Sequence, residues 1–257
     1  MRPNPLKRNL EEGGVALGTM VFEFATPGIA RIVASAGADF VVFDQEHSGW
    51  GIETIRMLMA TSRAAEVVPL VRVPSTQHHF IARPLDVGAS GVMVPMVETA
   101  EQARSIVTAA KYPPQGERGA AFGIGHDDYE AAEDMVSGMQ HANDETLLIA
   151  QIETTRGIEN FGEIAAVGGL DVLWIGHNDL TNSIGIPGQF DHPSYLRAVD
   201  RFLEACRGNG KAPGIMSTGV DEARVQLEQG FRCVGYWGDI WIYADALREG
   251  IAKISEK

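Results

Sequence analysis

Several features that mark common classes of protein are scarce or missing in this chain. Its 257 residues include only two cysteines, Cys206 and Cys233, and no Cys-x-x-Cys pair. Isolated thiols fit packing in a reducing compartment better than a disulfide framework, so we expect a cytoplasmic protein. The first ten residues carry Lys and Arg but no apolar segment follows, so neither a signal peptide nor a membrane span is expected.

Positive charge is also scarce. The chain has 21 Lys and Arg residues against 34 Asp and Glu residues, a formal net charge of -13. A surface this acidic repels phosphate backbones and anionic lipids, so neither nucleic acid nor a membrane is an expected partner. The phosphate loop Gly-x-x-x-x-Gly-Lys, a Gly-x-Gly-x-x-Gly segment opening a helix and the zinc motif His-Glu-x-x-His are all missing.

Short apolar runs alternate along the chain with segments whose apolar residues recur at helical spacing. Such runs, bounded by turn residues, are typical of strands buried on both faces. The expected strands cover residues 15–22, 39–44, 67–73, 91–97, 147–153, 172–175, 212–216 and 233–236. The expected helices cover residues 27–36, about 52–59, 76–86, a segment from 99 onward, 158–167, 194–209, 221–229 and 240 to the end.

Eight strands that are each followed by a helix indicate an α/β fold, a parallel (β/α)8 TIM barrel. No linker or shift in composition divides the chain, so residues 1–257 are expected to form a single domain. The alternation pauses between residues 112 and 143, where Pro and Gly residues predict a long irregular loop with a helix near 129–140. Thr99 and Gln102 form a capping-box pattern after the fourth strand.

Two of the apolar runs lead into a carboxylate. Glu153 closes the fifth expected strand, and Asp179 follows the sixth. A charge buried within a strand is costly, so each acid is expected where its strand ends, and in a parallel barrel these ends meet at one rim. Hard divalent cations prefer oxygen ligands, so Glu153 and Asp179 are predicted to hold one metal ion.

Other polar side chains fall at the same rim. Arg72 ends the third strand, and His47 follows the second strand after Asp44, which caps a turn in the simplest interpretation. Gln151 lies two residues before Glu153 and therefore points to the same side of its strand. None of the five lysines falls at such a strand end, which argues against a Schiff base and leaves metal-assisted electrophilic catalysis.

Each of these residues also has a purely structural interpretation. His47 is then an ordinary loop residue, and Arg72 is the partner of a nearby acid. Glu153 pairs with Arg156 on the next turn of the chain, and Asp179 caps the helix or turn that follows it. The convergence of residues from four strands on one cavity favours the catalytic interpretation.

At these positions the sequence resembles the HpcH/HpaI aldolase family of metal-dependent (class II) pyruvate aldolases. The resemblance extends from about Val15 to Trp237 and includes several motifs in order along the chain. The matching motifs are Phe43-Asp44-Gln45-Glu46-His47, Val71-Arg72, Leu85-Asp86-Val87-Gly88-Ala89, Val94-Pro95-Met96-Val97, Tyr112-Pro113-Pro114, Gly116-Glu117-Arg118-Gly119, Gln151-Ile152-Glu153-Thr154, Ile175-Gly176-His177-Asn178-Asp179-Leu180 and Gly210-Lys211-Ala212-Pro213-Gly214-Ile215.

The resemblance implies a metal centre and a way to bind the substrate. Glu153 and Asp179 would ligate Mg²⁺, Mn²⁺ or Co²⁺, with water and a 2-oxo acid in the other positions. Arg72 would contact the keto oxygen, and Gln151 the substrate or a metal-bound water. Backbone amides from Gly176 through His177 to Asn178 would hold the pyruvate carboxylate.

The resemblance also implies an acid/base group and an assembly. His47, oriented by Asp44, would shuttle protons through water. Asp86 matches a position that reaches into a neighbouring subunit's site. Members are typically homohexamers, built as trimers of dimers, whose last helix is exchanged between partners.

The implied activity is that of a carbon–carbon lyase. It would reversibly cleave 4-hydroxy-2-oxo acids to an aldehyde and pyruvate, or a related 2-oxo acid such as hydroxypyruvate, through a metal-stabilised enolate. Two alternatives on the same scaffold are an acyl-CoA lyase of the citryl- or malyl-CoA type and a metal-dependent oxaloacetate decarboxylase. The first would need a basic surface for the CoA phosphates, which this acidic chain does not supply, and a non-catalytic scaffold would not need a buried polar cluster.

Three positions depart from the family pattern. Gln45 stands where Gly usually precedes the Glu-His pair, and His177 stands where Pro usually follows Ile-Gly. The usually aromatic position of the first strand corresponds to Met20 or Val21. All three border the expected substrate mouth, so they affect the choice of aldehyde more than the type of reaction, and His177 serves either packing or substrate contact.

Overall fold

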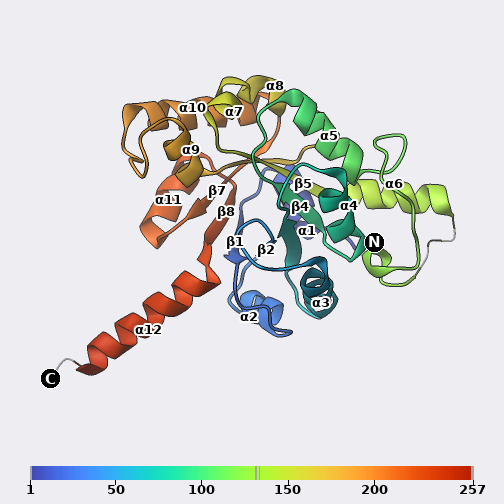
Figure 1. Cartoon of the computed structure of the whole chain (residues 1–257), viewed down its shortest axis with the longest axis horizontal. Helices are drawn as coiled ribbons and strands as arrows, with labels where there is room; N and C mark the ends of the chain where they lie inside the picture. Colours follow the sequence, from blue (N-terminus) through green and yellow to red (C-terminus); the bar gives the residue numbers. More distant parts are fainter. Residues whose placement is uncertain (1, 131, 133, 256–257) are drawn as a thin grey trace.

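The centre of the molecule is a closed barrel of parallel strands (Figure 1). The computed structural model describes residues 2–130, 132 and 134–255. The strands are β1 (Ala16–Val21), β2 (Phe40–Asp44), β3 (Val68–Arg72), β4 (Gly91–Val94), β5 (Leu147–Ile152), β6 (Val172–Ile175), β7 (Ala212–Ser217) and β8 (Cys233–Gly238). Each strand pairs with its successor, and β8 closes the ring on β1. The predicted (β/α)8 TIM barrel is therefore confirmed.

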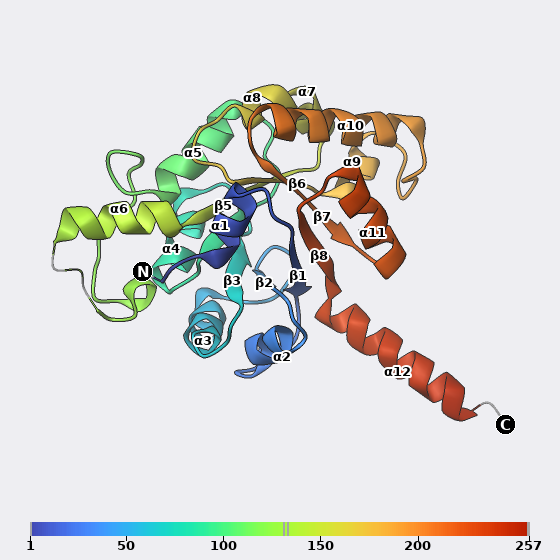
Figure 2. The ribbon, with the colours of Figure 1, turned by 180° about the vertical axis from the view of Figure 1, so that it is seen from behind.

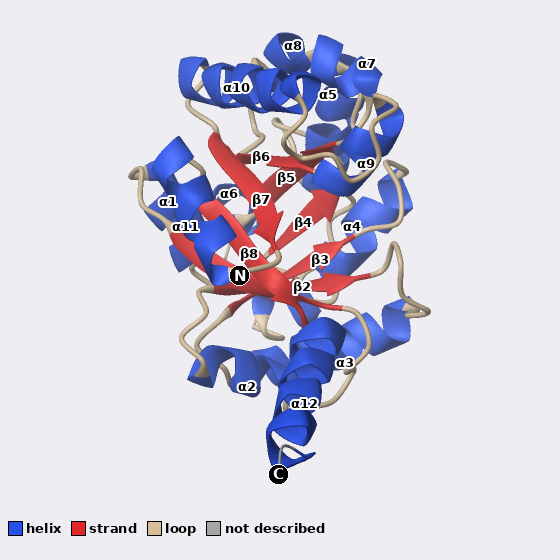
Figure 3. Ribbon diagram, turned by 90° about the vertical axis from the view of Figure 1, so that its left-hand side faces the viewer, coloured by secondary structure: helices blue, strands red, loops and turns tan. Residues whose placement is uncertain are grey.

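Helices surround the strands, as Figure 3 shows. They are α1 (Pro5–Glu11), α2 (Ile29–Ser35), α3 (Ile52–Ser62), α4 (His78–Asp86), α5 (Ala100–Ala110), the 3-10 helix η1 (Gly125–Asp127), α6 (Met135–Glu145), α7 (Thr155–Glu159), α8 (Phe161–Ala165), α9 (His177–Ser183), α10 (Pro193–Gly208), α11 (Val220–Gln229) and α12 (Asp239–Ser255). The predicted capping box is confirmed, because the side chains of Thr99 and Gln102 each accept a hydrogen bond from the other residue's backbone N–H.

Three helical segments differ from the prediction. Helix α1 was not expected, although Asn4 caps it and Pro5 occupies its first turn. The expected helix near 129–140 is wrong in position, because Tyr129 has a left-handed backbone (φ 66°) and the carboxylate of Asp134 caps a helix that begins at Met135. The expected helix 158–167 is two short helices that meet at Asn160.

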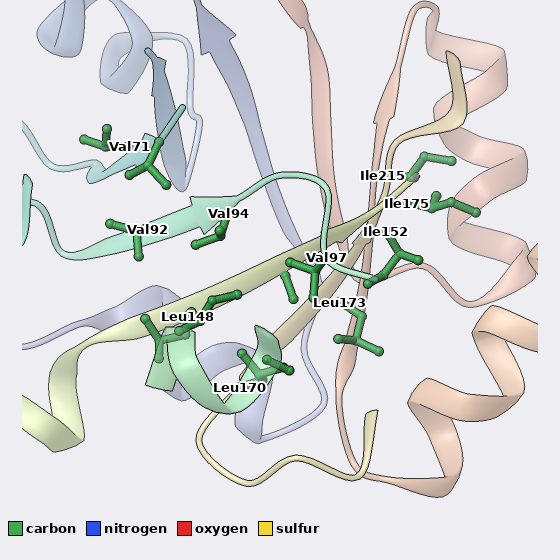
Figure 4. Close-up of a cluster of buried hydrophobic side chains, with 14 of the residues drawn as sticks. Val71, Val92, Val94, Val97, Leu148, Ile152, Leu170, Leu173, Ile175 and Ile215 are labelled. Carbon is green, nitrogen blue, oxygen red and sulfur yellow. The ribbon is translucent and has the colours of Figure 1, made fainter. Parts of the chain in front are cut away.

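Two apolar layers follow from the alternation of side chains along each strand. On β5, Leu147 and Ile149 belong to the layer inside the barrel. At the amino end of the barrel this layer also includes residues of α1. Leu148 and Ile152 belong to the larger layer between strands and helices, part of which Figure 4 shows. The same alternation turns Gln151 toward the barrel axis. Because Gln151 lies near the carboxyl end of β5, its side chain reaches the open end of the barrel and not the packed interior.

Helix α12 is the one element that leaves the body of the barrel, as both faces of the molecule show (Figures 1 and 2). Its exposed apolar residues are Trp241, Ile242, Tyr243, Leu247, Ile251 and Ile254. Among the described residues, no helix has the length and apolar character needed to cross a bilayer.

Candidate active site

A cavity of about 130 Å³ opens at the carboxyl ends of the strands, where the sequence predicts the site. Its polar lining consists of His47, Arg72, Gln151, His177, Asn178 and Asp179. Its apolar lining consists of Met20, Phe22, Trp174, Ile175, Met216 and Trp241. Polar residues from the ends of four strands, β2, β3, β5 and β6, are thus brought to one mouth.

Glu153 lies directly after β5, and its carboxylate is held from two sides. It accepts hydrogen bonds from the backbone N–H of Met96 at 2.7 Å and from the side-chain amide of Gln151. Met96 presents its N–H from a left-handed backbone with φ 56°. A β-carbon at position 176 would collide with the same carboxylate, so Gly176 leaves room for it. Arg156 pairs with Glu98 at 3.7 Å, and the alternative partner proposed for Glu153 is therefore engaged elsewhere.

Three carboxylates influence one another at this mouth. Burial raises the pKa of Glu153 to about 7, although the Gln151 and Met96 hydrogen bonds lower it, and the charges of Glu46 and Asp179 raise it further. Burial raises the pKa of Glu46 to about 7 as well, against the opposing charge of Arg72. The site therefore holds more negative charge than its own side chains neutralise.

Arg72 is the cation of this cluster. Its Nε donates to Asp44 at 2.5 Å, and its Nη1 lies 3.1 Å from Glu46 Oε2. The contact between Arg72 Nη1 and Glu46 Oε2 is not aligned as a hydrogen bond. The buried Oε2 atom of Glu46 therefore has no hydrogen-bond partner among the described residues. Both partners of Arg72 are acids of the turn after β2, so the structural interpretation of Arg72 is correct and is compatible with a catalytic role.

Asp44 organises the turn that carries His47. Its carboxylate accepts hydrogen bonds from the backbone N–H groups of Glu46 at 3.2 Å and of His47 at 2.7 Å. The expected orientation by Asp44 thus acts on the backbone of His47, and the imidazole Nε2 lies 3.7 Å from Glu46 Oε2. The His47 side chain is 59% exposed, which leaves it free to meet a substrate at the mouth.

Helix α9 begins directly after β6 and contributes the remaining predicted residues. Gly176 precedes its first turn, which contains His177, Asn178 and Asp179. Asp179 therefore lies inside the helix rather than capping it. The imidazole of His177 is buried and packs edge-on against Phe190 at 5.3 Å, and burial lowers the pKa of His177. His177 therefore packs against the protein, as one of the two expectations has it, and also lines the cavity.

Asp86 is the predicted site residue that the chain does not bring to its own mouth. It ends α4, and its carboxylate accepts hydrogen bonds from Nε and Nη2 of Arg118 at 3.1 and 2.7 Å. The guanidinium of Arg118 in turn lies over the ring of Tyr112 at 4.8 Å. A role for Asp86 in this reaction therefore requires a second subunit.

Several functional residues were missed or left open by the sequence. Glu46 was assigned no role, although it stands two residues after Asp44 in the same turn. Met20 is the first-strand residue that lines the cavity, whereas Val21 packs in the outer layer. Phe22 and Trp241 had no sequence signal, because the contact that brings them together joins opposite ends of the chain.

The described residues also bear on metal and amine chemistry. Within residues 2–130, 132 and 134–255, no group of three or more His, Cys, Asp or Glu side chains is arranged to hold a metal ion. A cation at this mouth would take two protein carboxylates and leave other positions open, which is a common arrangement for Mg²⁺. Lys7, Lys111 and Lys211 all bond to groups at the amino end of the barrel, and Lys257 lies outside the described residues.

The chain is similar to known proteins over nearly its whole length. Residues 19–241 match the family described as HpcH/HpaI aldolase/citrate lyase. The sequence is 35% identical to hydroxypyruvate/pyruvate aldolase of Roseobacter denitrificans, covering 92% of this chain and 91% of the relative. It is 37% identical to 4-hydroxy-2-oxovalerate aldolase of Novosphingobium aromaticivorans, covering 99% and 95%. The crystal structure of an HpcH/HpaI aldolase from Desulfitobacterium hafniense has a TM-score of 0.93 at 33% identity, covering 98% of this chain and 97% of that one.

Proposed function

This chain belongs to the HpcH/HpaI aldolase/citrate lyase family, and on that premise we propose that it is a divalent-metal-dependent aldolase. It reversibly cleaves 4-hydroxy-2-oxo acids to an aldehyde and pyruvate or a related 2-oxo acid such as hydroxypyruvate. The names of the two aldolase relatives support this substrate class. The observation that carries the proposal is the acidic cluster at the carboxyl end of the barrel, where Asp44 and Glu46 contact the single guanidinium of Arg72 and the charges of Glu46 and Asp179 act on Glu153.

The residues at the mouth fit a divalent cation. The buried Oε2 atom of Glu46 has no hydrogen-bond partner among the described residues, and burial together with the charges of Glu46 and Asp179 raises the pKa of Glu153, both of which a cation at the mouth would offset. We assign Glu153 and Asp179 as the residues that hold Mg²⁺, Mn²⁺ or Co²⁺. When bound, such a cation acts as a Lewis acid that stabilises negative charge developing on the keto oxygen of the substrate.

The remaining polar residues divide the work of binding and proton transfer. Arg72, fixed by Asp44, contacts the keto oxygen with a charge-assisted hydrogen bond. Gln151 holds Glu153 and contacts the bound acid. The backbone N–H groups of His177 and Asn178 at the start of α9 hold the substrate carboxylate.

His47 performs the proton transfer. During cleavage its neutral imidazole takes the proton of the C4 hydroxyl, through water, as the C3–C4 bond breaks and the aldehyde forms. The electron pair of that bond leaves as the enolate of the 2-oxo acid, and the imidazolium then returns the proton to C3, which releases pyruvate. In the synthetic direction the imidazolium returns that proton to the new alkoxide. The turn built by Asp44 holds His47 at the mouth, where a substrate bound through Arg72 presents its hydroxyl.

The aldehyde side of the cavity has an apolar lining. Phe22, Met216 and Trp241 line it, and Arg72 is the only Lys or Arg among the described lining residues. This composition favours small aldehydes over a CoA thioester, whose phosphates need several positive charges.

A retro-aldol assay tests the proposal. Protein treated with a chelator should release no pyruvate from a 4-hydroxy-2-oxo acid, and added Mg²⁺, Mn²⁺ or Co²⁺ should restore the release. Full activity in the chelator would overturn the metal dependence. Rapid CO₂ release from oxaloacetate without any cleavage or condensation of aldols would instead identify a decarboxylase.

We further propose that the chain acts in the cytoplasm as a single-domain subunit of a homohexamer, a trimer of dimers that exchange α12. The row of exposed apolar residues on α12 supports such an exchange, and so does the position of Asp86 away from its own mouth. Two buried free thiols fit a reducing compartment. Sedimentation of Leu247→Glu should show smaller particles than the parent chain, whereas an unchanged hexamer would exclude the exchange.

A further inference from the structure

The first residue of α12 binds the loop that follows β1. Asp239 is buried, and its carboxylate accepts hydrogen bonds from three successive backbone N–H groups, those of Phe22 at 2.9 Å, Glu23 at 3.0 Å and Phe24 at 2.8 Å. Three donors that converge on one charged acceptor fix the path of a loop firmly. The carboxylate therefore sets where the ring of Phe22 lies.

The ring of Phe22 lies between α12 and the cation of the site. It meets the ring of Trp241 edge-on at 5.0 Å, and the guanidinium of Arg72 lies 5.6 Å from its centre. The edge of the same guanidinium faces the carboxylates of Asp44 and Glu46. The acids fix the edge of the guanidinium, and an aromatic ring at this distance fixes its face by a cation–π interaction.

We propose that Phe22, held in place by Asp239, is a positioning residue for Arg72. This inference depends on the proposed function, in which Arg72 contacts the keto oxygen. Phe22 orients the planar guanidinium without touching the reacting atoms, and Asp239 acts one step further away. A cation–π contact of this kind corresponds to about a 2- to 30-fold change in substrate affinity or rate.

A matched pair of substitutions isolates the contribution of the ring. Phe22→Leu removes the ring but keeps an apolar side chain, and Phe22→Tyr keeps the ring. Two readouts apply with Mn²⁺ present: exchange of the pyruvate methyl protons in D₂O, and the dissociation constant of oxalate, a planar analogue of the enolate. Phe22→Leu should weaken both by about 2- to 30-fold, and Phe22→Tyr should stay close to the parent.

A double-mutant cycle separates positioning from general damage. In an Arg72→Lys background the planar guanidinium is gone, so Phe22→Leu should change oxalate affinity by less than about 2-fold. An equal loss in both backgrounds would overturn the proposal. Asp239→Ala should reproduce the loss of Phe22→Leu without adding to it. If that protein does not fold, Asp239→Asn, which keeps one acceptor oxygen, gives the same comparison.

The parent protein distinguishes the two levels of the argument. If it neither exchanges pyruvate protons nor binds oxalate with any of the three metals, the proposed function fails. If it does both, but Phe22→Leu has no effect or an additive one, only the positioning role of Phe22 fails. Unfolding midpoints of the metal-free variants identify any loss that comes from a disrupted fold.

Discussion

The two ends of the barrel treat buried charge in opposite ways. At the amino end, Lys7 pairs with Asp171 at 2.6 Å, and the other carboxylate oxygen of Asp171 accepts the N–H of Leu148 at 2.7 Å. Lys111 and Lys211 donate to backbone carbonyl groups, as with Lys211 Nζ and Leu170 O at 2.8 Å. Lys7 and Asp171 thus form an ion pair, and carbonyl oxygens accept the hydrogen bonds of Lys111 and Lys211, although burial lowers the pKa of Lys111 to about 8.

At the carboxyl end, acids outnumber the cation available to them. Burial raises the pKa of both Glu46 and Glu153, the charge of Asp179 raises both pKa values further, and Arg72 lowers that of Glu46. Removing one partner from a buried ion pair is strongly destabilising, whereas an incompletely paired cluster persists at a cost in stability that function explains. The comparison teaches that the matched end serves folding and the unmatched end serves chemistry.

The largest expected effect is at the unmatched end. Glu153→Gln keeps the size of the side chain but removes a predicted metal ligand, so retro-aldol activity should fall about 10³-fold, equivalent to about 4 kcal/mol of transition-state stabilisation. The metal-free variant should unfold at the same or a higher temperature, because one unpaired charge is removed. Glu159→Gln, on the exposed face of α7, is the matched control and should change neither. A strong loss of stability without loss of activity in Glu153→Gln would break the comparison.

The next effect concerns His47. Its replacement by alanine should lower the cleavage rate by about 10²-fold, at the lower end for a positioned acid/base group, because water can enter the exposed mouth and relay part of the proton transfer. The measurement is the rate of cleavage, monitored as the release of pyruvate. His78→Ala, at an exposed position of α4, is the control. Retention of the full rate would remove His47 from the chemistry.

The third effect belongs to the matched end. Asp171→Asn removes the nearer of the two carboxylates beside the nearly buried Lys7, since Glu11 lies 3.7 Å away, and the free energy of unfolding should fall by about 1–3 kcal/mol. The rate per folded molecule should not change. Denaturant unfolding checks the first statement, and Asp221→Asn, whose carboxylate is 98% exposed, should leave the midpoint in place. Reduced turnover with normal stability in Asp171→Asn would contradict the division between the two ends.

The smallest effect is a pH dependence outside both clusters. Burial lowers the pKa of His126, with Arg118 acting in the same direction and Asp127, Asp86 and the Ala121 carbonyl opposing. Below pH 6.5 the unfolded chain binds this proton before the folded one does, so stability is lost as the pH falls. His126→Gln should flatten that decline below about pH 6.5 by less than about 1.4 kcal/mol per pH unit, the limit for one proton. Unfolding at several pH values tests this, and an unchanged slope would exclude His126 as its source.

The sequence was sufficient to predict the barrel and the gathering of polar side chains at its carboxyl end. The alternation of strands and helices is local, and the charged residues at strand ends, such as Arg72 and Glu153, are read directly from the sequence. Once the strands are parallel, the topology alone brings their carboxyl ends together. The substrate groups that Arg72 and Gln151 are expected to contact came from the family resemblance, and the spacing of the residues does not predict them.

Other parts depend on contacts that no local pattern contains. Glu46 belongs to the cluster only because Arg72 lies opposite its turn. Asp239 binds Phe22 across 217 positions, and nothing near either residue predicts that contact. The position of α6 was missed because the left-handed backbone at Tyr129 ends the preceding turn, a conformation that an aromatic residue rarely adopts.

Met96 holds the same uncommon backbone conformation on the rim, with its N–H directed at Glu153. A residue with a β-carbon is strained in this conformation, and the rest of the fold maintains that strain. The loop therefore holds the N–H of Met96 in one direction, toward the carboxylate of Glu153. Glycine at position 96 would adopt this conformation without strain and would also adopt others, so the carboxylate of Glu153 would be held less firmly. With methionine at position 96, the loop stays rigid and keeps the carboxylate of Glu153 in place.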